Sequence, residues 1–218
     1  MKLQQITFSQ AVHYHQTGDG GVRRSPVPMV RALEDRYGFV QIPRTMQEFD
    51  FNKGVTFFQG YFQGEVIDKF QMYERGLLCE SKKSTSLCDL FLEEVFSWVP
   101  VKFDIPVKPT GVRSYASQVE VLTSIDIGEA FSKFAPIGKF VSEKLRSYGQ
   151  APDDFSISGL RMHYDIQGKP SPQAPEFAFE RRATVPYTSN LFFSAAPLST
   201  SDHLEALDAL EDLLVKFR

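Results

Sequence analysis

The chain has 218 residues, of which 42% are hydrophobic and 23% are charged. This length and this balance predict a globular protein with one large domain or two small ones. The formal net charge of −3 argues against a protein built chiefly to neutralise nucleic-acid phosphates.

The cysteine count and the start of the sequence bear on where the protein works. Two cysteines, Cys79 and Cys88, are too few for a disulfide framework or a paired-cysteine metal site. Residues 1–5 lack the apolar core of a signal peptide, and no stretch reaches the roughly 20 apolar residues of a spanning helix. We therefore expect a cytoplasmic protein with no membrane partner.

The first half of the chain shows a strand, a helix, three strands and a second helix. A polar, glycine-rich loop over 9–28 follows the first strand, and the short breaks between the later strands are typical of hairpins. Gly38 is a suitable stop for the first helix, Ser86 is a suitable cap for the second, and Pro100 ends it. The expected strands cover residues 2–8, 54–62, 65–74 and 77–82, and the expected helices cover 29–38 and 87–99.

A proline-rich connector over 100–111 leads to a second half with the same order of elements. In this half Pro136 is expected to kink or split the long helix. Asp202 and Glu205 have the spacing of a capping box at the start of the last helix. The expected strands cover residues 113–127, 155–165, 176–185 and 190–196, and the expected helices cover 128–148 and 202–217.

Each half thus follows the pattern βαβββα, and each ends with a strand, a Ser-Thr-Ser sequence and an amphipathic helix. We expect an α+β fold in which about four helices pack on an antiparallel sheet. Two duplicated halves, covering 1–105 and 106–218, are one interpretation, and a single compact domain is the other. Identity between the halves is low, so duplication rests on the order of elements.

The glycine-rich segment 17–25 is a candidate anion site. Its three glycines allow backbone N–H groups to converge, and Arg23 and Arg24 add positive charge before a helix N-terminus. The segment lacks the Gly-Lys-Ser/Thr ending of a nucleotide-binding Walker loop. An ordinary loop is the alternative interpretation.

Two hairpins carry pairs of basic residues beside aromatic ones. Lys82 and Lys83 lie in the first half, and Arg181 and Arg182 lie in the second. Basic residues interleaved with aromatics bind single-stranded nucleic acid through charge and stacking. Packing of the same aromatics in the core is the alternative, so nucleic acid stays a second candidate partner.

No catalytic or cofactor signature stands out in the sequence. His13 and His15 are spaced to share one face of a strand, a pattern that can chelate a metal, but no helical metal-binding motif is present. Cys88 is better placed than Cys79 as a nucleophile because a helix N-terminus lowers a thiol's pKa, although buried cysteines are usually inert. We expect no metal, no cofactor and no enzymatic activity, and catalytic residues stay unassigned.

Adjacent phenylalanines give the main functional expectation. Phe57/Phe58 and Phe192/Phe193 point to opposite faces of their strands, whereas a sheet covered on one face is polar on the other. Either both faces are covered within the chain or the second face meets a partner. We expect a non-enzymatic interaction or assembly subunit, in a homo-oligomer or a larger protein complex, that binds through these four aromatics. A nucleic-acid- or nucleotide-binding subunit is the alternative, and a thiol- or metal-dependent enzyme is the third.

Overall fold

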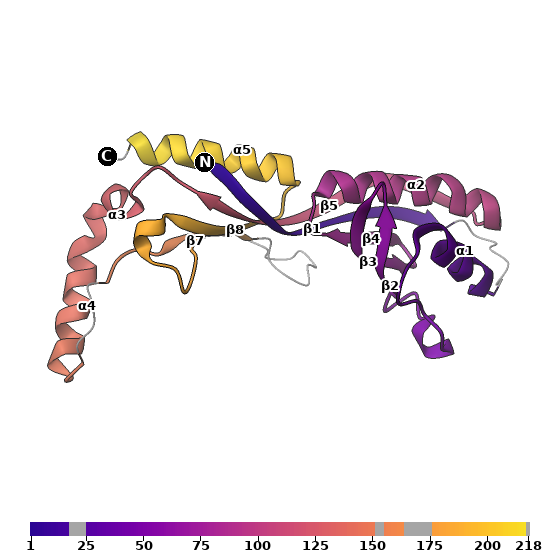
Figure 1. Cartoon of the computed structure of the whole chain (residues 1–218), viewed down its shortest axis with the longest axis horizontal. Coiled ribbons are helices and arrows are strands. Elements are labelled where there is room, and N and C mark those ends of the chain that lie inside the picture. The colour runs from indigo at the N-terminus through magenta and orange to yellow at the C-terminus, as the bar shows by residue number, and fades with distance from the viewer. Residues whose placement is uncertain (18–24, 151–154, 164–175, 217–218) are drawn as a thin grey trace. The chain divides into compact units, whose positions relative to one another are not determined.

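A computed structural model of the chain describes residues 1–17, 25–150, 155–163 and 176–216. In these ranges the fold is α+β, which confirms the predicted class (Figure 1). The strands are β1 (Lys2–Thr17), β2 (Val55–Phe62), β3 (Glu65–Tyr73), β4 (Gly76–Ser81), β5 (Val107–Leu122), β6 (Gly159–His163), β7 (Glu176–Arg181) and β8 (Leu191–Ala196). The helices are α1 (Val27–Tyr37), α2 (Thr85–Phe103), α3 (Ile127–Ala130), α4 (Ala135–Ser147) and α5 (Thr200–Lys216). Within the described ranges, the strands form an antiparallel sheet with neighbours in the order β2-β3-β4-β1-β5-β8-β7-β6.

The order strand, helix, three strands, helix occurs twice along the chain. The first series is β1-α1-β2-β3-β4-α2, and the second is β5-α3/α4-β6-β7-β8-α5. The closing helix of each series begins at the threonine of a Ser-Thr-Ser sequence. Descent of the two series from one duplicated unit stays a prediction.

The chain divides into two compact units, each of which is described by itself. The N-terminal unit comprises Ile6–Gln118 and Pro197–Ser201. The C-terminal unit comprises Met1–Gln5, Val119–Ala196 and Asp202–Arg218. The start of β1 thus belongs to the C-terminal unit, and most of β5 belongs to the N-terminal unit. The predicted halves 1–105 and 106–218 stay a hypothesis about how the chain evolved and folds.

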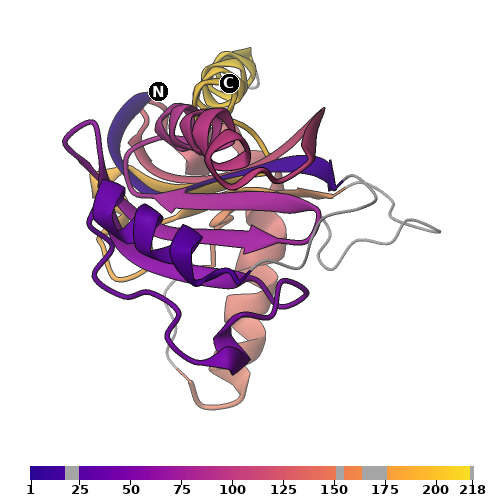
Figure 2. The ribbon, with the colours of Figure 1, turned by 90° about the vertical axis from the view of Figure 1, so that its right-hand side faces the viewer.

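The N-terminal unit has an aromatic core beneath α1 and α2, the indigo and magenta helices of Figure 2. Phe57 of β2 and Phe70 of β3 lie with ring centroids 5.6 Å apart, and Phe91 of α2 lies 5.2 Å from Phe70. Tyr37 of α1 contacts Phe91 at 4.9 Å, so both helices close the same core. Aromatic side chains bury about 150–250 Å² each, so this cluster dominates the packing of the unit.

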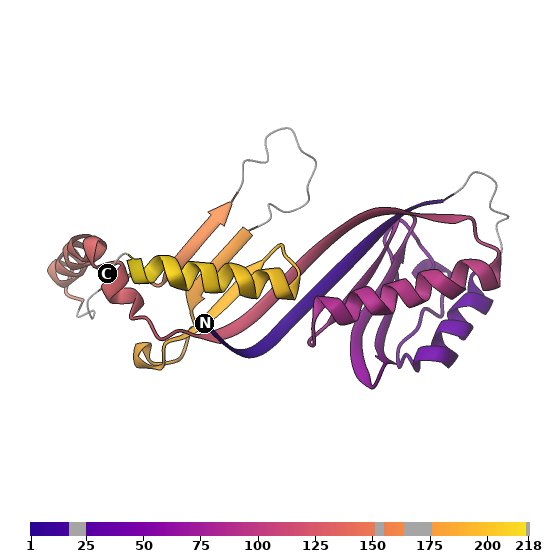
Figure 3. The same cartoon turned by 90° about the horizontal axis from the view of Figure 1, so that it is seen from above.

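In the C-terminal unit, α5 lies over β7 and β8 (Figure 3). Leu207 and Leu214 of α5 are buried, and the rings of Phe179 and Phe192 stack at 4.5 Å on the two strands. The amino group of Met1 pairs with Asp208 of α5 at 2.6 Å. No helix in the described ranges is long and apolar enough to cross a membrane.

Several predicted boundaries are confirmed. Gly38 caps α1 in the left-handed conformation, with φ of 63°. The predicted long helix is broken, and Pro136 lies in the first turn of α4, where its missing N–H removes no helical hydrogen bond.

Other predicted boundaries are wrong. Residues 9–17 continue β1 instead of forming a loop, because Ala11, His13 and His15 alternate as buried positions of a strand. The last helix begins at Thr200, so Asp202 lies inside its first turn and not at a capping box.

The ends of α2 also differ from prediction. Ser84, not Ser86, is the N-cap, and its side chain accepts a hydrogen bond from the backbone N–H of Leu87. Pro100 does not end α2, because the N–H groups of Asp104 and Ile105 close a further turn onto its carbonyl oxygen. The proline-rich connector therefore shrinks to residues 104–106, and β5 begins directly after it.

Candidate functional site

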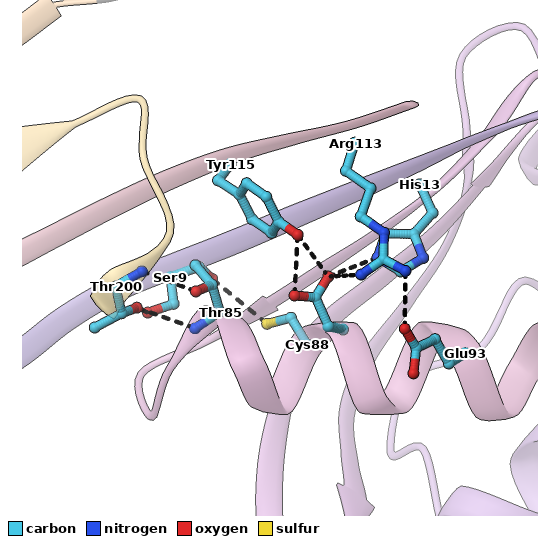
Figure 4. Close-up of polar contacts among 9 residues, drawn as sticks. Ser9, His13, Thr85, Cys88, Glu93, Arg113, Tyr115 and Thr200 are labelled. Atoms are coloured by element: carbon cyan, nitrogen blue, oxygen red, sulfur yellow. Dashed lines mark hydrogen bonds and ion pairs between the residues drawn. The ribbon is translucent and has the colours of Figure 1, made fainter. Parts of the chain in front are cut away.

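The two Ser-Thr-Ser sequences meet in the N-terminal unit (Figure 4). The backbone N–H of Thr85 donates to Oγ1 of Thr200 at 3.0 Å, and the N–H of Thr200 donates to Oγ1 of Thr85 at 2.8 Å. The hydroxyl of Ser9 lies 3.3 Å from Thr200 Oγ1, and all three residues are buried. Each threonine thus satisfies a helix-start N–H of the other series, which is a structural role.

The same sequence offsets from the two threonines hold two cysteines in the first series and a serine and a histidine in the second. Cys79 and Cys88 stand six residues before and three after Thr85, and Ser194 and His203 stand at the same offsets from Thr200. Ser194 Oγ lies 2.8 Å from His203 Nε2 and donates to the carbonyl of Ala178 at 2.7 Å. The serine proton is therefore committed to the carbonyl, and the imidazole must donate to the serine oxygen.

This Ser194–His203 pair is not arranged as a nucleophile and its base. Both side chains are fully buried in the C-terminal unit, and burial lowers the pKa of His203 to about 4. A general base has to accept the proton of its nucleophile, whereas here the hydrogen bond runs in the opposite direction. The pair is a satisfied polar contact between β8 and α5.

The two cysteines are equally enclosed. Both are fully buried, and the Sγ of Cys88 lies 3.9 Å from the carbonyl oxygen of Ser9. Burial raises the pKa of Cys79 well above its usual range. A thiol nucleophile needs an accessible thiolate, so the surroundings of these residues do not favour one.

The predicted placement of His13 and His15 on one strand face is confirmed. Both rings contact Phe96 of α2, at centroid distances of 6.3 and 5.7 Å. His13 Nε2 lies 2.6 Å from Oδ1 of Asp89, a residue of α2. In the part of the chain that the structure describes, no group of three or more His, Cys, Asp or Glu residues is placed to hold a metal ion.

Asp89 of α2 is the centre of a polar network that joins the helix to β1 and β5. Figure 4 shows its partners His13, Tyr115 and Arg113. The hydroxyl of Tyr115 reaches both carboxylate oxygens, at 3.1 and 3.3 Å. Arg113 lies 3.6 Å from the same carboxylate and 2.9 Å from Glu93. The carboxylate accepts hydrogen bonds from a histidine and a tyrosine and forms an ion pair with an arginine, so it is well satisfied, and the network joins two strands to the helix.

The predicted basic patches are largely used within the chain. Arg182 pairs with Glu120 at 3.0 Å, and Lys83 pairs with Glu65 at 2.9 Å. Arg181 lies over the ring of Tyr187 at 4.4 Å and donates to its carbonyl oxygen. Lys82 is exposed. Arg23 and Arg24 of the glycine-rich segment lie outside the described residues.

The four predicted interface phenylalanines differ in their exposure. Phe57 and Phe192 are fully buried core residues of their units. Phe58 is 38% exposed, and Phe193 is half-buried with the guanidinium of Arg182 over its ring at 6.0 Å. Side-chain alternation therefore leaves Phe58 and Phe193 to carry the predicted contact with a partner.

Helix α4 of the C-terminal unit presents an apolar surface that sequence reasoning missed. Of its residues, all of which the structure describes, only Ser142 is buried. Ile137 is 66% exposed, Phe140 57% and the preceding Phe134 56%. A groove of about 280 Å³ runs along the helix, lined by Phe131, Phe134, Ile137, Val141, Phe155 and Ile157.

The signal for this surface was present as a stripe of apolar residues at helical spacing. Such a stripe normally predicts a face buried within the chain. Nothing in the spacing itself distinguishes a buried stripe from an exposed one. We call the exposed residues Phe134, Ile137, Phe140 and Tyr148 the α4 surface.

No model of a known protein family matches this chain, and no curated protein sequence is significantly similar to it.

Proposed function

We propose that the protein is a non-enzymatic assembly subunit that binds a second copy of itself through the α4 surface. The observation that carries the proposal is the exposure of three large apolar side chains: Ile137 and Phe140 on the amphipathic helix α4, and Phe134 directly before it. Contiguous apolar patches on a protein surface commonly mark sites of association. Burying a large apolar side chain contributes about 1.5–3 kcal/mol, so a few such residues supply a substantial driving force.

The charges around α4 favour an acidic partner surface. Lys133, Lys139, Lys144 and Arg146 lie on or beside the helix, against the single acid Glu143. Pairing α4 with α4 of another copy would bring these cations together, which is unfavourable.

Helix α5 carries the complementary surface. Its exposed acidic residues recur at three- and four-residue spacing, and two exposed apolar residues, Leu213 and Val215, stand near its end. The acidic residues are Asp202, Glu205, Asp208 and Asp212. We therefore place α4 of one copy against α5 of the other. In a two-fold symmetric dimer this contact forms twice, so one substitution in the chain changes the binding free energy at two places.

The first experiment measures the native mass by light scattering after size-exclusion chromatography, over a range of protein and salt concentrations. We expect a concentration-dependent dimer that weakens as salt screens the charges. Phe140→Glu should shift the equilibrium to monomer, because it places a charge in the apolar contact. Val101→Glu is the matched control: Val101 is 81% exposed on α2 of the other unit, and the dimer should persist.

Charge reversal tests the proposed pairing of helices. Lys139→Glu with Lys144→Glu should weaken the dimer, and Glu205→Lys with Asp212→Lys in the same chain should restore it. A protein that is monomeric at every concentration contradicts the proposal. So does a dimer that is indifferent to Phe140→Glu.

A further inference from the structure

A cavity of about 600 Å³ lies in the N-terminal unit, whereas the α4 surface belongs to the C-terminal unit. It is open to solvent on one side and bounded by the C-terminal part of α2, the residues before β2, and the ends of β1 and β3. Apolar side chains make up most of its wall, among them Met29, Phe51, Met72, Leu77, Val95 and Val99. Small-molecule sites commonly have this volume and this largely apolar lining, with a few polar groups that orient the ligand.

His15 is the polar group placed to orient a ligand in this cavity. The residue lines the cavity and is only 8% exposed. Its Nδ1 atom is buried and has no hydrogen-bond partner among the described residues. An unsatisfied buried polar atom costs about 1–3 kcal/mol, so such an atom facing a cavity indicates a missing partner.

The surroundings of His15 decide what that partner has to supply. Of the two ring nitrogens, Nδ1 alone is both buried and without a partner among the described residues, so the ring proton is better placed on Nε2. Burial lowers the pKa of His15, so the neutral ring is favoured. A neutral imidazole that donates through Nε2 carries a lone pair on Nδ1, and this nitrogen accepts a hydrogen bond.

The charges of the cavity wall restrict the ligand further. Asp50 and Glu74 are the ionisable acids of the lining, and no lysine or arginine contributes to the wall among the described residues. The described part of the wall thus offers no cation that could pair with an anionic ligand. We infer that the cavity binds a neutral, mainly apolar molecule that donates one O–H or N–H hydrogen bond to His15.

The test compares three probes of nearly equal shape by equilibrium dialysis against the full chain. The probes are 2-naphthol, which donates a hydrogen bond, 2-methylnaphthalene, which does not, and 2-naphthoate, which carries a negative charge. We expect 2-naphthol to bind saturably and roughly tenfold more tightly than 2-methylnaphthalene, as one hydrogen bond to a buried acceptor predicts. The naphthoate should bind more weakly than 2-naphthol. In ¹⁵N spectra of the imidazoles, 2-naphthol should shift the Nδ1 signal of His15.

Two variants locate the site. His15→Phe keeps a ring against Phe96 but removes the acceptor, so 2-naphthol and 2-methylnaphthalene should then bind equally. Val99→Phe places a larger side chain in the cavity and should weaken binding of both. Val101→Phe is the matched control, because Val101 lies two residues further along α2 and is exposed.

The proposal is overturned by any of three results: no saturable binding to the folded protein, equal affinity for 2-naphthol and 2-methylnaphthalene, or binding that Val99→Phe leaves unchanged. The first two results need no variant, so they hold even where a substitution impairs folding. Because the cavity and the α4 surface share no residue, failure of one proposal leaves the other standing.

Discussion

Thr85 and Thr200 give a structural reason for the threonine in each of the two Ser-Thr-Ser sequences. Each is the first residue of a helix, where backbone N–H groups have no partner within the helix. Each hydroxyl oxygen supplies that missing acceptor to the other threonine, across 115 residues of sequence. Because the contact is buried, losing either hydroxyl would leave a backbone N–H unsatisfied. The reciprocal contact gives both threonines a role in the fold that requires no chemistry at their hydroxyls.

His203 should make stability depend on pH. Burial lowers its pKa from 6.5 to about 4, so below pH 6.5 the unfolded chain takes up a proton that the folded chain refuses. The contribution of the neutral ring is thus complete above pH 6.5 and is lost as the pH falls towards 4. By linkage the loss is roughly 3 kcal/mol. Urea unfolding at pH 7.5, 6 and 5 should show this decline, and His203→Gln should flatten it.

The matched control is His163→Gln, because His163 is exposed at the end of β6. Burial also lowers the pKa of His15, so His203→Gln keeps a part of the slope. Parallel curves for the wild type and His203→Gln would contradict the assignment.

At the scale of elements, α4 is attached to its unit by a close approach of backbones. A Cβ atom built on Gly138 would lie 2.0 Å from the carbonyl oxygen of Phe155. The hydroxyl of Ser142 accepts the N–H of Phe155 at 3.1 Å and donates to the carbonyl of Gly138 at 3.0 Å. One glycine and one serine therefore hold the segment at Phe155 against a helix whose apolar face is exposed.

Gly138→Ala tests this attachment, because helix propensity and the close contact with Phe155 predict opposite changes in stability. In an unconstrained helix the change stabilises by up to about 1 kcal/mol, because alanine is the better helix former. Here the added methyl group meets a backbone oxygen, so we expect a net destabilisation and at least tenfold faster amide exchange at Phe155. Lys139→Ala on the neighbouring exposed position should leave that exchange unchanged. Slower exchange in Gly138→Ala would show that the close approach is not maintained.

The same elements show what the sequence could predict. Gly38 and Pro136 impose local backbone geometry, so their effects on helix ends followed from residue type alone. The length of β1 did not follow, because a strand containing His13, Tyr14 and His15 is locally as polar as a loop. The alternation of buried and exposed side chains in this part of β1 depends on a tertiary contact, because Phe96 of α2 packs against the two histidine rings.

The candidate sites were harder to predict than the elements. The stripe of α4 was visible, but its exposure depends on whether another element covers it. The cations Arg181 and Arg182 were visible too. In the fold, however, Arg181 stacks on Tyr187 and Arg182 forms an ion pair with Glu120. Tertiary contacts of this kind lie between residues that no local pattern connects.

At the scale of the whole molecule, the compact units do not follow the repeat of the sequence. Most of β5 belongs to the second series but lies in the N-terminal unit, as do Pro197–Ser201. Tyr115 of β5 bonds to Asp89, and Thr200 bonds to Thr85, so the N-terminal unit is completed by residues from beyond its own series. We therefore expect the N-terminal series to depend on residues of the second series for its folding.

Two fragments test this dependence. Residues 1–118 retain the part of β5 that carries Tyr115, whereas residues 1–105 end before β5 begins and leave Asp89 without that partner. We expect 1–118 to unfold cooperatively in urea, with a higher midpoint than 1–105. Trp98 of α2 is the only tryptophan of the chain, so its fluorescence reports on the N-terminal unit alone in both fragments. Equal midpoints, or a 1–118 fragment that does not fold, would contradict the prediction. Equal midpoints with cooperative unfolding would make residue 105 a true folding boundary, because β5 would then add nothing to the unit in which it lies.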